Sequence, residues 1–528
     1  MKKYQSILLA ACAFSLVACE PEFENEVSNE IYHGGEVNLS RYVALGNSLT
    51  SGYMDGTMFR SGQQYSFPNL LAKQFAVVGG GEFTQPSFND DVNNLGGLTL
   101  MGQQAAATRL ILNMSTSGPE NLQGTPTIEI SNLQAKAYHN MGVPGAKSFH
   151  LLAAGYGNLA NVPVGKANPY FVRHATTPNA TILADAMSLE PTFFTNWIGS
   201  NDVLAYALSG GTGVNQAGNI DPATYGGNDI TDPQVFAATY NAIINTLTSQ
   251  GAKGVVATVP YVTSIPHFTT VPYNPLTTEA LGGEATIDQL NAQLLGVLKQ
   301  ILTALGESDR INLFSKTEGN SLLVKDESLT DLSQQITAVA SQNPQLAPLA
   351  PILGQLYGQA RHATKDDLFV LSTSSVIGTT SNSPIFEMVP SPYKELLSKV
   401  GVTFPLEDQY VLIPSEQKEI KEATDAFNDI IWAAARSKNL AIADMNLIMR
   451  YLTNGIRLTD GQYYTADYFK GTENMNKVLF SLDGVHPNPR GYAFVANEIV
   501  KVINEHYKAH LPMLVPGNYP GVTIKGSN

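Results

Sequence analysis

Short apolar segments alternate along this chain with segments whose apolar residues recur at helical spacing. The strand-like runs are rich in β-branched, aromatic and other apolar residues and cover residues 42–45, 191–198, 254–260 and 440–443. The helix-like segments follow them, at residues 67–75, 180–189, 233–250, 414–437 and 489–507. Another strand end is predicted where an apolar stretch runs into Gly142-Val143-Pro144-Gly145. This alternation predicts an α/β fold with a mostly parallel sheet and helices on both of its faces.

Two stretches interrupt the alternation. Residues 79–131 are rich in Gly, Asn, Thr and Ser and are predicted to form an irregular insertion. Residues 262–409 form a longer insertion, with helices predicted at 286–305 and near 329–341 and a strand near 368–371. We therefore expect one domain over residues 39–507 that carries both insertions, followed by a C-terminal tail over 508–528.

The N-terminus resembles a lipoprotein signal peptide over residues 1–18. Lys2 and Lys3 precede a short apolar core that is too short for a comfortable membrane span. Leu16-Val17-Ala18-Cys19 resembles the lipobox of bacterial lipoproteins, in which cleavage precedes the cysteine and its thiol is lipidated. An ordinary signal peptide is the alternative. The resemblance implies a lipid on Cys19, a flexible tether over 19–38, and a membrane-anchored protein of the outer membrane that faces the periplasm or the cell surface.

Composition narrows the possible functions. The chain has 528 residues and is 43% hydrophobic, enough to bury a sizeable core. Its net charge of −14 disfavours nucleic-acid binding. Its two cysteines are Cys12, which leaves with the signal peptide, and Cys19, so we expect no disulfide in the mature protein. Histidines and carboxylates lack metal-ligand spacing, and we expect neither a metal nor another cofactor.

Four short segments carry candidate chemistry, each at a predicted strand end or helix start. They are Gly46-Asn47-Ser48-Leu49, Asn140 to Gly145, Gly199-Ser200-Asn201-Asp202 and Asp483-Gly484-Val485-His486-Pro487-Asn488. A serine hydroxyl becomes a good nucleophile when a base accepts its proton. Imidazole titrates near neutral pH, and a carboxylate can fix its tautomer. Ser48, His486 and Asp483 are therefore the candidate nucleophile, base and orienting acid.

The four segments and their order resemble the SGNH, or GDSL-type, hydrolase family, over residues 40–507 without the insertions. The resemblance implies a flavodoxin-like three-layer α/β/α sandwich and ester hydrolysis through an acyl-enzyme. It also implies an oxyanion hole made by the backbone N–H groups of Ser48 and Gly145 and the side chain of Asn201. Gly142 is the fallback for Gly145. Asn47 stands where the family most often has Asp; its amide oxygen can accept a hydrogen bond but carries no charge.

The predicted function is a serine esterase that acts on lipid esters or on O-acyl or O-acetyl groups of glycans. The alternative is a non-catalytic lipoprotein that binds a glycan or a protein partner on the same fold. The 262–409 insertion is interpreted as a lid or a separate subdomain. Tyr261 and His267 follow the predicted strand at 254–260 and are candidates for the substrate pocket, because ligands gather beyond the carboxyl ends of strands. The sequence does not predict an oligomeric state.

Overall fold

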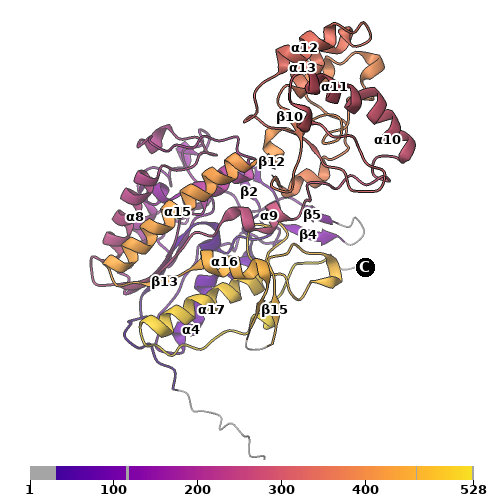
Figure 1. Ribbon diagram of the computed structural model, residues 1–528. Helices are drawn as coiled ribbons and strands as arrows, with labels where there is room; N and C mark the ends of the chain where they lie inside the picture. Colours follow the sequence, from indigo (N-terminus) through magenta and orange to yellow (C-terminus); the bar gives the residue numbers. More distant parts are fainter. Residues whose placement is uncertain (1–30, 114–117, 459–460, 526–528) are drawn as a thin grey trace, which may run out of the picture.

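The computed structural model describes residues 31–113, 118–458 and 461–525 (Figure 1). In these residues the central sheet has five strands, all parallel, in the order β6-β1-β7-β8-β13. Their bounds are β1 (Tyr42–Gly46), β6 (Asn140–Gly142), β7 (Phe193–Trp197), β8 (Lys253–Ala257) and β13 (Ala441–Ala443). β1 is fully buried along its length, as its apolar sequence requires. The α/β class with a parallel sheet, predicted from the sequence, is confirmed.

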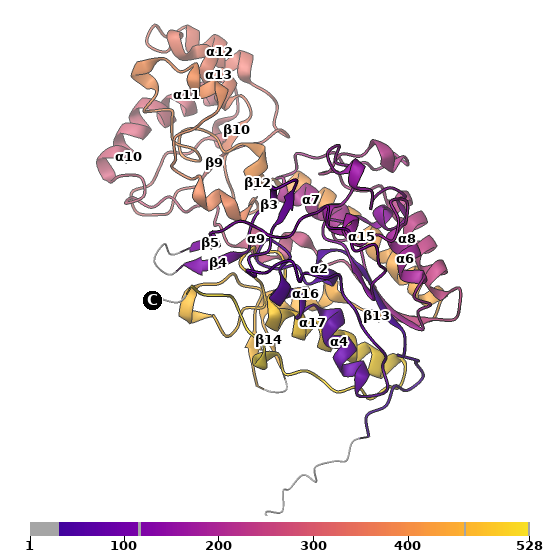
Figure 2. The ribbon, with the colours of Figure 1, turned by 180° about the vertical axis from the view of Figure 1, so that it is seen from behind.

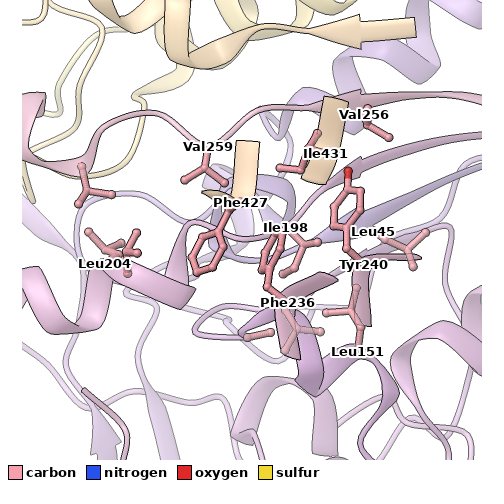
Figure 3. Close-up of a cluster of buried hydrophobic side chains, with 14 of the residues drawn as sticks. Leu45, Leu151, Ile198, Leu204, Phe236, Tyr240, Val256, Val259, Phe427 and Ile431 are labelled. Atoms are coloured by element: carbon pink, nitrogen blue, oxygen red, sulfur yellow. The ribbon is translucent and has the colours of Figure 1, made fainter. Parts of the chain in front are cut away.

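Helices pack on both faces of this sheet. One face carries α6 (Ile182–Met187), α8 (Pro233–Thr248) and α15 (Pro414–Ser437), and the other carries α4 (Phe67–Ala76) and α17 (Pro489–His506). On the first face Phe236 of α8 stacks on Phe427 of α15 with ring centroids 4.2 Å apart (Figure 3). α8 begins where the Asp232 side chain accepts the N–H groups of Gln234 and Val235, with Pro233 at the first helical position. The arrangement is compatible with a three-layer α/β sandwich.

Shorter helices and hairpins complete this part of the fold. The helices are α2 (Ser48–Ser51), α3 (Arg60–Gln63), α5 (Pro169–Val172), α7 (Asn201–Leu208), α9 (Pro266–Thr269) and α16 (Met445–Asn454). The hairpins are β2 (Leu98–Leu100) with β3 (Gln103–Ala106), β4 (Leu110–Asn113) with β5 (Gly118–Asn121), and β14 (Ile456–Arg457) with β15 (Tyr463–Tyr464).

The first insertion is more regular than its composition predicted, since it contains the two hairpins β2–β3 and β4–β5. Its strands include Gln103-Gln104 and Gly118-Pro119, which lack the apolar alternation that identifies a strand in a sequence. The C-terminal segment packs on the second hairpin. Leu112 of β4 pairs with Ile524, and the carbonyl oxygen of Leu112 accepts the N–H of Lys525 at 2.8 Å.

The second insertion folds around a hydrophobic core of its own, separate from the two cores that flank the sheet. Its helices are α10 (Glu284–Leu290), the π-helix η5 (Asn291–Leu295), α11 (Gly296–Ala304), α12 (Ser333–Ser341), α13 (Ala350–Tyr357) and α14 (Pro384–Glu387). Its strands are β9 (Leu323–Lys325), β10 (Ala360–His362) and β11 (Leu368–Phe369), and β11 pairs with β12 (Val411–Leu412), which directly follows the insertion. Figures 1 and 2 show this unit projecting from the sheet domain, with the β4–β5 hairpin at its base. The helix predicted over 286–305 is therefore one run whose middle turn is π-helical.

The N-terminal segment joins the fold before the predicted start of the domain. His33 pairs with His510, and Glu36 donates its N–H to the carbonyl oxygen of Tyr507. The predicted tether, 19–38, thus overlaps the packed chain at residues 33–37. The signal peptide and Cys19 lie outside the described residues. Within the described part of the chain, no helix combines the length and the apolar character needed to cross a membrane.

Candidate functional site

Three of the four candidate segments emerge side by side from the sheet. β1 lies between β6 and β7, and Gly46 at its end is in register with Gly142 and Trp197. The three strands are parallel, so the segments that follow them leave the sheet at the same edge, where open α/β sheets place their ligands. Ser48, Gly145 and Asn201 lie in these three segments, directly after the strand ends.

The turn that carries Ser48 requires glycine at position 46. A Cβ at Gly46 would lie 2.1 Å from Thr50 Oγ1 and 2.5 Å from the carbonyl oxygen of Trp197, so only glycine fits there. Asn47 then caps α2, because its Oδ1 accepts the N–H of Leu49 at 3.0 Å. Ser48 is the first residue of α2, and its own N–H has no hydrogen-bond acceptor within the described residues. The turn therefore presents a serine together with an unused backbone donor.

Asn47 stands at the position where the family that the four segments resemble most often has a carboxylate. Its side chain is fully buried, and Oδ1 performs the capping that a carboxylate oxygen would otherwise perform. Nδ2 has no hydrogen-bond partner among the described residues. The substitution thus keeps the helix cap and leaves one buried amide nitrogen unsatisfied.

Asp483 and His486 form a close pair on the loop before α17. His486 Nδ1 lies 2.9 Å from Asp483 Oδ2, while Asp483 Oδ1 accepts the backbone N–H groups of Val485 and His486, both at 2.9 Å. Burial alone would raise the pKa of the Asp483 carboxyl, but His486 and these N–H groups hold that pKa below its ordinary value. A charged carboxylate against Nδ1 favours the tautomer with its proton on Nδ1, which leaves Nε2 as the proton acceptor.

The segment after Ser48 is bonded to this acid–base loop. The N–H of Gly56 donates to Asp483 Oδ2 at 3.0 Å. The Tyr53 ring packs against the His486 imidazole, with centroids 4.6 Å apart. Tyr53 also donates its N–H to the carbonyl oxygen of Ser48 at 3.1 Å. One short segment therefore connects the helix of the candidate nucleophile with both members of the Asp483–His486 pair.

The Ser48 hydroxyl and the His486 imidazole are not joined by a hydrogen bond within the described residues. Ser48 is nearly buried, with 6% of its surface exposed. Such nucleophile–base contacts are often loose in the absence of substrate and shorten when substrate binds. The structure thus brings Asp483 and His486 into direct contact and links Ser48 to them through Tyr53.

The two candidate glycines for the oxyanion hole differ in what their N–H groups do. The N–H of Gly142 donates to Asn140 Oδ1 at 3.0 Å, and a Cβ at Gly142 would lie 2.4 Å from the nitrogen of Ser51. Gly145 has φ +79° and is exposed, and its N–H has no acceptor within the described residues. The N–H of Gly142 is therefore already bonded and the residue closely packed, while the N–H of Gly145 is free to donate.

Asn201 is oriented by the loop that carries Gly145. Its Nδ2 donates to the carbonyl oxygen of Ala146 at 3.0 Å, which uses one of the two amide hydrogens. Asp202, the next residue, accepts both the N–H and the hydroxyl of Ser148 at 2.8 Å. Burial raises the pKa of Asp202, and the Ser148 bonds oppose that rise. These contacts fix the Gly145 loop to the start of α7.

The two predicted pocket residues lie in different surroundings. His267 donates its backbone N–H to the carbonyl oxygen of Gly484 at 2.9 Å, and its Nδ1 lies 3.3 Å from the carbonyl oxygen of Asp483. Burial lowers the pKa of His267. Tyr261 instead donates its hydroxyl to Asp425 of α15. His267 therefore contacts the acid–base loop, whereas a place for Tyr261 in a substrate pocket stays a prediction.

Asp55 is a buried carboxyl beside the site that sequence reasoning missed. It is 4% exposed and has φ +51°; its Oδ1 accepts the N–H of Leu482 at 3.1 Å, and its own N–H donates to Ser481 Oγ. Burial raises the pKa of Asp55 to about 7, the Leu482 N–H opposes this, and the charge of Asp483 adds to it. In the sequence, Asp55-Gly56 has the composition of an ordinary turn, and only its position shortly after Ser48 marks it.

Within the described residues, no group of three or more His, Cys, Asp or Glu side chains is arranged to hold a metal ion. No protein-family model, curated protein or solved structure matches this chain. The resemblance to SGNH hydrolases accordingly rests on the four segments themselves.

Proposed function

We propose that this protein is a serine esterase that works through an acyl-enzyme. Ser48 attacks the ester carbonyl, His486 accepts the serine proton through Nε2 and returns it to the leaving alcohol, and Asp483 orients the imidazole. Water then attacks the acyl-enzyme with His486 again as base, which releases the acid and restores Ser48. The N–H groups of Ser48 and Gly145 and the side chain of Asn201 stabilise the oxyanion.

The observation that carries this proposal is the Asp483–His486 pair and its contacts with the segment that follows Ser48: Gly56 donates its N–H to Asp483, and the Tyr53 ring packs against His486. The donors at this site support it: the N–H groups of Ser48 and Gly145 have no acceptor within the described residues, and Asn201 Nδ2 keeps one amide hydrogen besides the one that it donates to Ala146. A binding protein has no chemical need for an oriented imidazole and three such donors at the same sheet edge.

The test compares Ser48→Ala with Ser51→Ala, which removes another buried hydroxyl of the same short helix. Both proteins and the wild type are treated with a fluorophosphonate probe and assayed on p-nitrophenyl esters. We expect labelling and turnover in the wild type and in Ser51→Ala, and neither in Ser48→Ala. A folded wild type that is neither labelled nor active would favour the non-catalytic binding lipoprotein.

We further propose a flavodoxin-like fold and membership of the SGNH family. The strand order supports the fold: numbered along the chain, the sheet reads 2-1-3-4-5, the order of flavodoxin-like sheets. In this proposal the insertion at 262–409 is an addition between the fourth strand, β8, and the helix α15 that precedes the fifth.

The proposed location is the outer membrane, with the protein anchored by lipid at Cys19. The resemblance of Leu16-Val17-Ala18-Cys19 to a lipobox supports it. Metabolic labelling with a fatty-acid analogue and fractionation of cells test it. We expect label and membrane association in the wild type and a loss of both in Cys19→Ala; an unlabelled wild type would contradict the anchor.

A further inference from the structure

We propose that a cavity beside Asp483 binds a long apolar chain of the ester substrate, so that the enzyme prefers long-chain esters to acetylated glycans. This inference rests on the proposed esterase function and selects one of its substrate classes. The cavity has a volume of about 830 Å³. An apolar cavity of about 150 Å³ already holds benzene, so this space is several times larger than a six-carbon ring requires.

The cavity lies where three parts of the chain meet. Val271, Leu371 and Ile377 come from the second insertion, Leu110 and Pro119 come from the β4–β5 hairpin, and Asp483 comes from the acid–base loop. Leu371 reaches the loop closely, since a Cβ at Gly484 would lie 3.3 Å from its Cδ2. A substrate chain in this cavity would therefore extend from the candidate catalytic centre along the face of the insertion.

Four of the five hydroxyl groups in the cavity wall, all but that of Ser372, donate to backbone carbonyls. Thr270 donates to Pro266 at 2.6 Å, Ser374 to Leu371 at 2.8 Å, and Tyr468 to Leu482 at 2.6 Å. A sugar placed here would lose hydrogen bonds to water and find few donors in return, which is unfavourable. An alkyl chain has no hydrogen bonds to water to lose, and its apolar surface would be buried against leucine, valine and proline. The wall thus favours a hydrocarbon over a glycan.

A second apolar cavity borders the chain neighbours of Ser48 and His486 but is much smaller. It is lined by Leu49 and Pro487, the neighbours of Ser48 and His486, together with residues of α16 and α17, and its volume is about 90 Å³. It has room for only a short group. A long chain therefore needs the larger cavity, and the two cavities predict different dependences of the rate on chain length.

The first experiment measures kcat/KM for p-nitrophenyl esters from butyrate to hexadecanoate, each below its critical micelle concentration. We expect kcat/KM to rise roughly three- to fourfold per added methylene over the first additions. Ile377→Trp places a bulky indole in the cavity and should lower the ratio of dodecanoate to butyrate kcat/KM at least tenfold. Ile385→Trp enlarges another partly buried side chain of the same insertion, outside this cavity, and should keep the wild-type ratio. A flat wild-type profile, or the same ratio in both variants, overturns the inference.

The second experiment does not depend on catalysis. Ser48→Ala protein is titrated with a fluorescent long-chain fatty acid, and Ile377→Trp introduced into it should weaken binding at least tenfold. If the wild type binds this probe but hydrolyses no ester, the esterase proposal fails and the cavity assignment stands. If it hydrolyses short esters or acetylated glycans but does not bind the probe, the cavity assignment fails and the esterase proposal stands.

Discussion

Gly56 donates its backbone N–H to Asp483 Oδ2 at 3.0 Å, although 427 positions separate the two residues in the sequence. Asp483 Oδ2 is the oxygen that also contacts His486 Nδ1. The segment that follows the candidate nucleophile therefore shares a hydrogen-bond acceptor with the candidate base. This shared oxygen holds the imidazole in a fixed position relative to the turn that carries Ser48.

The substitution Asp483→Asn should separate orientation from folding. The introduced amide can still accept the N–H groups of Val485 and His486 through its oxygen, but its NH2 group, in the place of Oδ2, can accept neither the Gly56 N–H nor a proton from His486 Nδ1. We expect kcat to fall by roughly 10³- to 10⁴-fold with KM little changed. Asp185→Asn is the control, since Asp185 is a buried carboxyl bonded to Thr176 instead. Equal losses of kcat in both variants would argue against the assigned role.

Removal of the Asn201 side chain should lower kcat by about 100-fold or more, because one oxyanion donor is lost. Asn201 also holds the carbonyl oxygen of Ala146, so a purely structural effect needs a control. Asn168→Ala removes a similar bond, from Nδ2 to the carbonyl oxygen of Pro144 in the same loop. We expect a much smaller loss of kcat there, at comparable thermal stability. If kcat fell more in Asn168→Ala than in Asn201→Ala, Asn201 would not be the oxyanion donor.

The two glycines of the second segment should respond differently to alanine. A Cβ at position 145 would have no atom nearer than Asn168 Nδ2, at 3.9 Å, so Gly145→Ala causes no clash. It strains only the backbone, which has φ +79°, and should cost about 1 to 2 kcal/mol of stability. Gly142→Ala would meet the backbone of Ser51 at 2.4 Å and should cost about 3 kcal/mol. Denaturant unfolding measures both values. Activity per folded molecule should fall further in Gly145→Ala, since only that N–H is a free donor.

Asp55→Asn should change how stability depends on pH. The folded state holds the pKa of Asp55 near 7, above its ordinary 3.8. The folded protein therefore keeps a proton that the unfolded chain releases, so wild-type stability falls as pH rises from about 4 to 7. Asn keeps the acceptor for the Leu482 N–H and tolerates the left-handed backbone. We expect the unfolding free energy of the variant, relative to that of wild type, to rise by on the order of 2 to 4 kcal/mol between pH 4 and pH 8.

The unfolding free energies of wild type and Asp55→Asn at several pH values provide the check. Asp185→Asn serves here too, because it removes a buried carboxyl away from the acid–base loop. A constant difference between wild type and Asp55→Asn across this pH range would show that Asp55 is already ionised in the folded protein at pH 4.

The central sheet could be predicted from the sequence because its longer strands, β1, β7 and β8, are rich in apolar residues. Tyr42 to Leu45 and Val255 to Ala257 are buried on both faces, and that condition selects such residues strongly. The hairpins of the first insertion were missed because Gln103-Gln104 and Gly118-Pro119 pair through their backbones at the surface, where side-chain pattern carries little information. The separate core of the second insertion depends on contacts between distant segments, which periodicity does not report.

The candidate site was predictable only as a set of residue types. Ser48, Asn201, Asp483 and His486 have side chains whose chemistry fits one reaction, so their order along the chain was informative. Gly145 could be separated from Gly142 only when the bond of the Gly142 N–H to Asn140 was visible. Asp55 and Tyr53 act through backbone and ring contacts, and their residue types alone do not indicate these contacts.

The pairing of Leu112 with Ile524 has a practical consequence for the choice of expression vector. An affinity tag at the C-terminus would follow a segment that pairs with the hairpin on one side of the large cavity. Such a tag could crowd substrates out and imitate a narrow specificity. Tags placed ahead of residue 31 would keep that side of the molecule free for kinetic work.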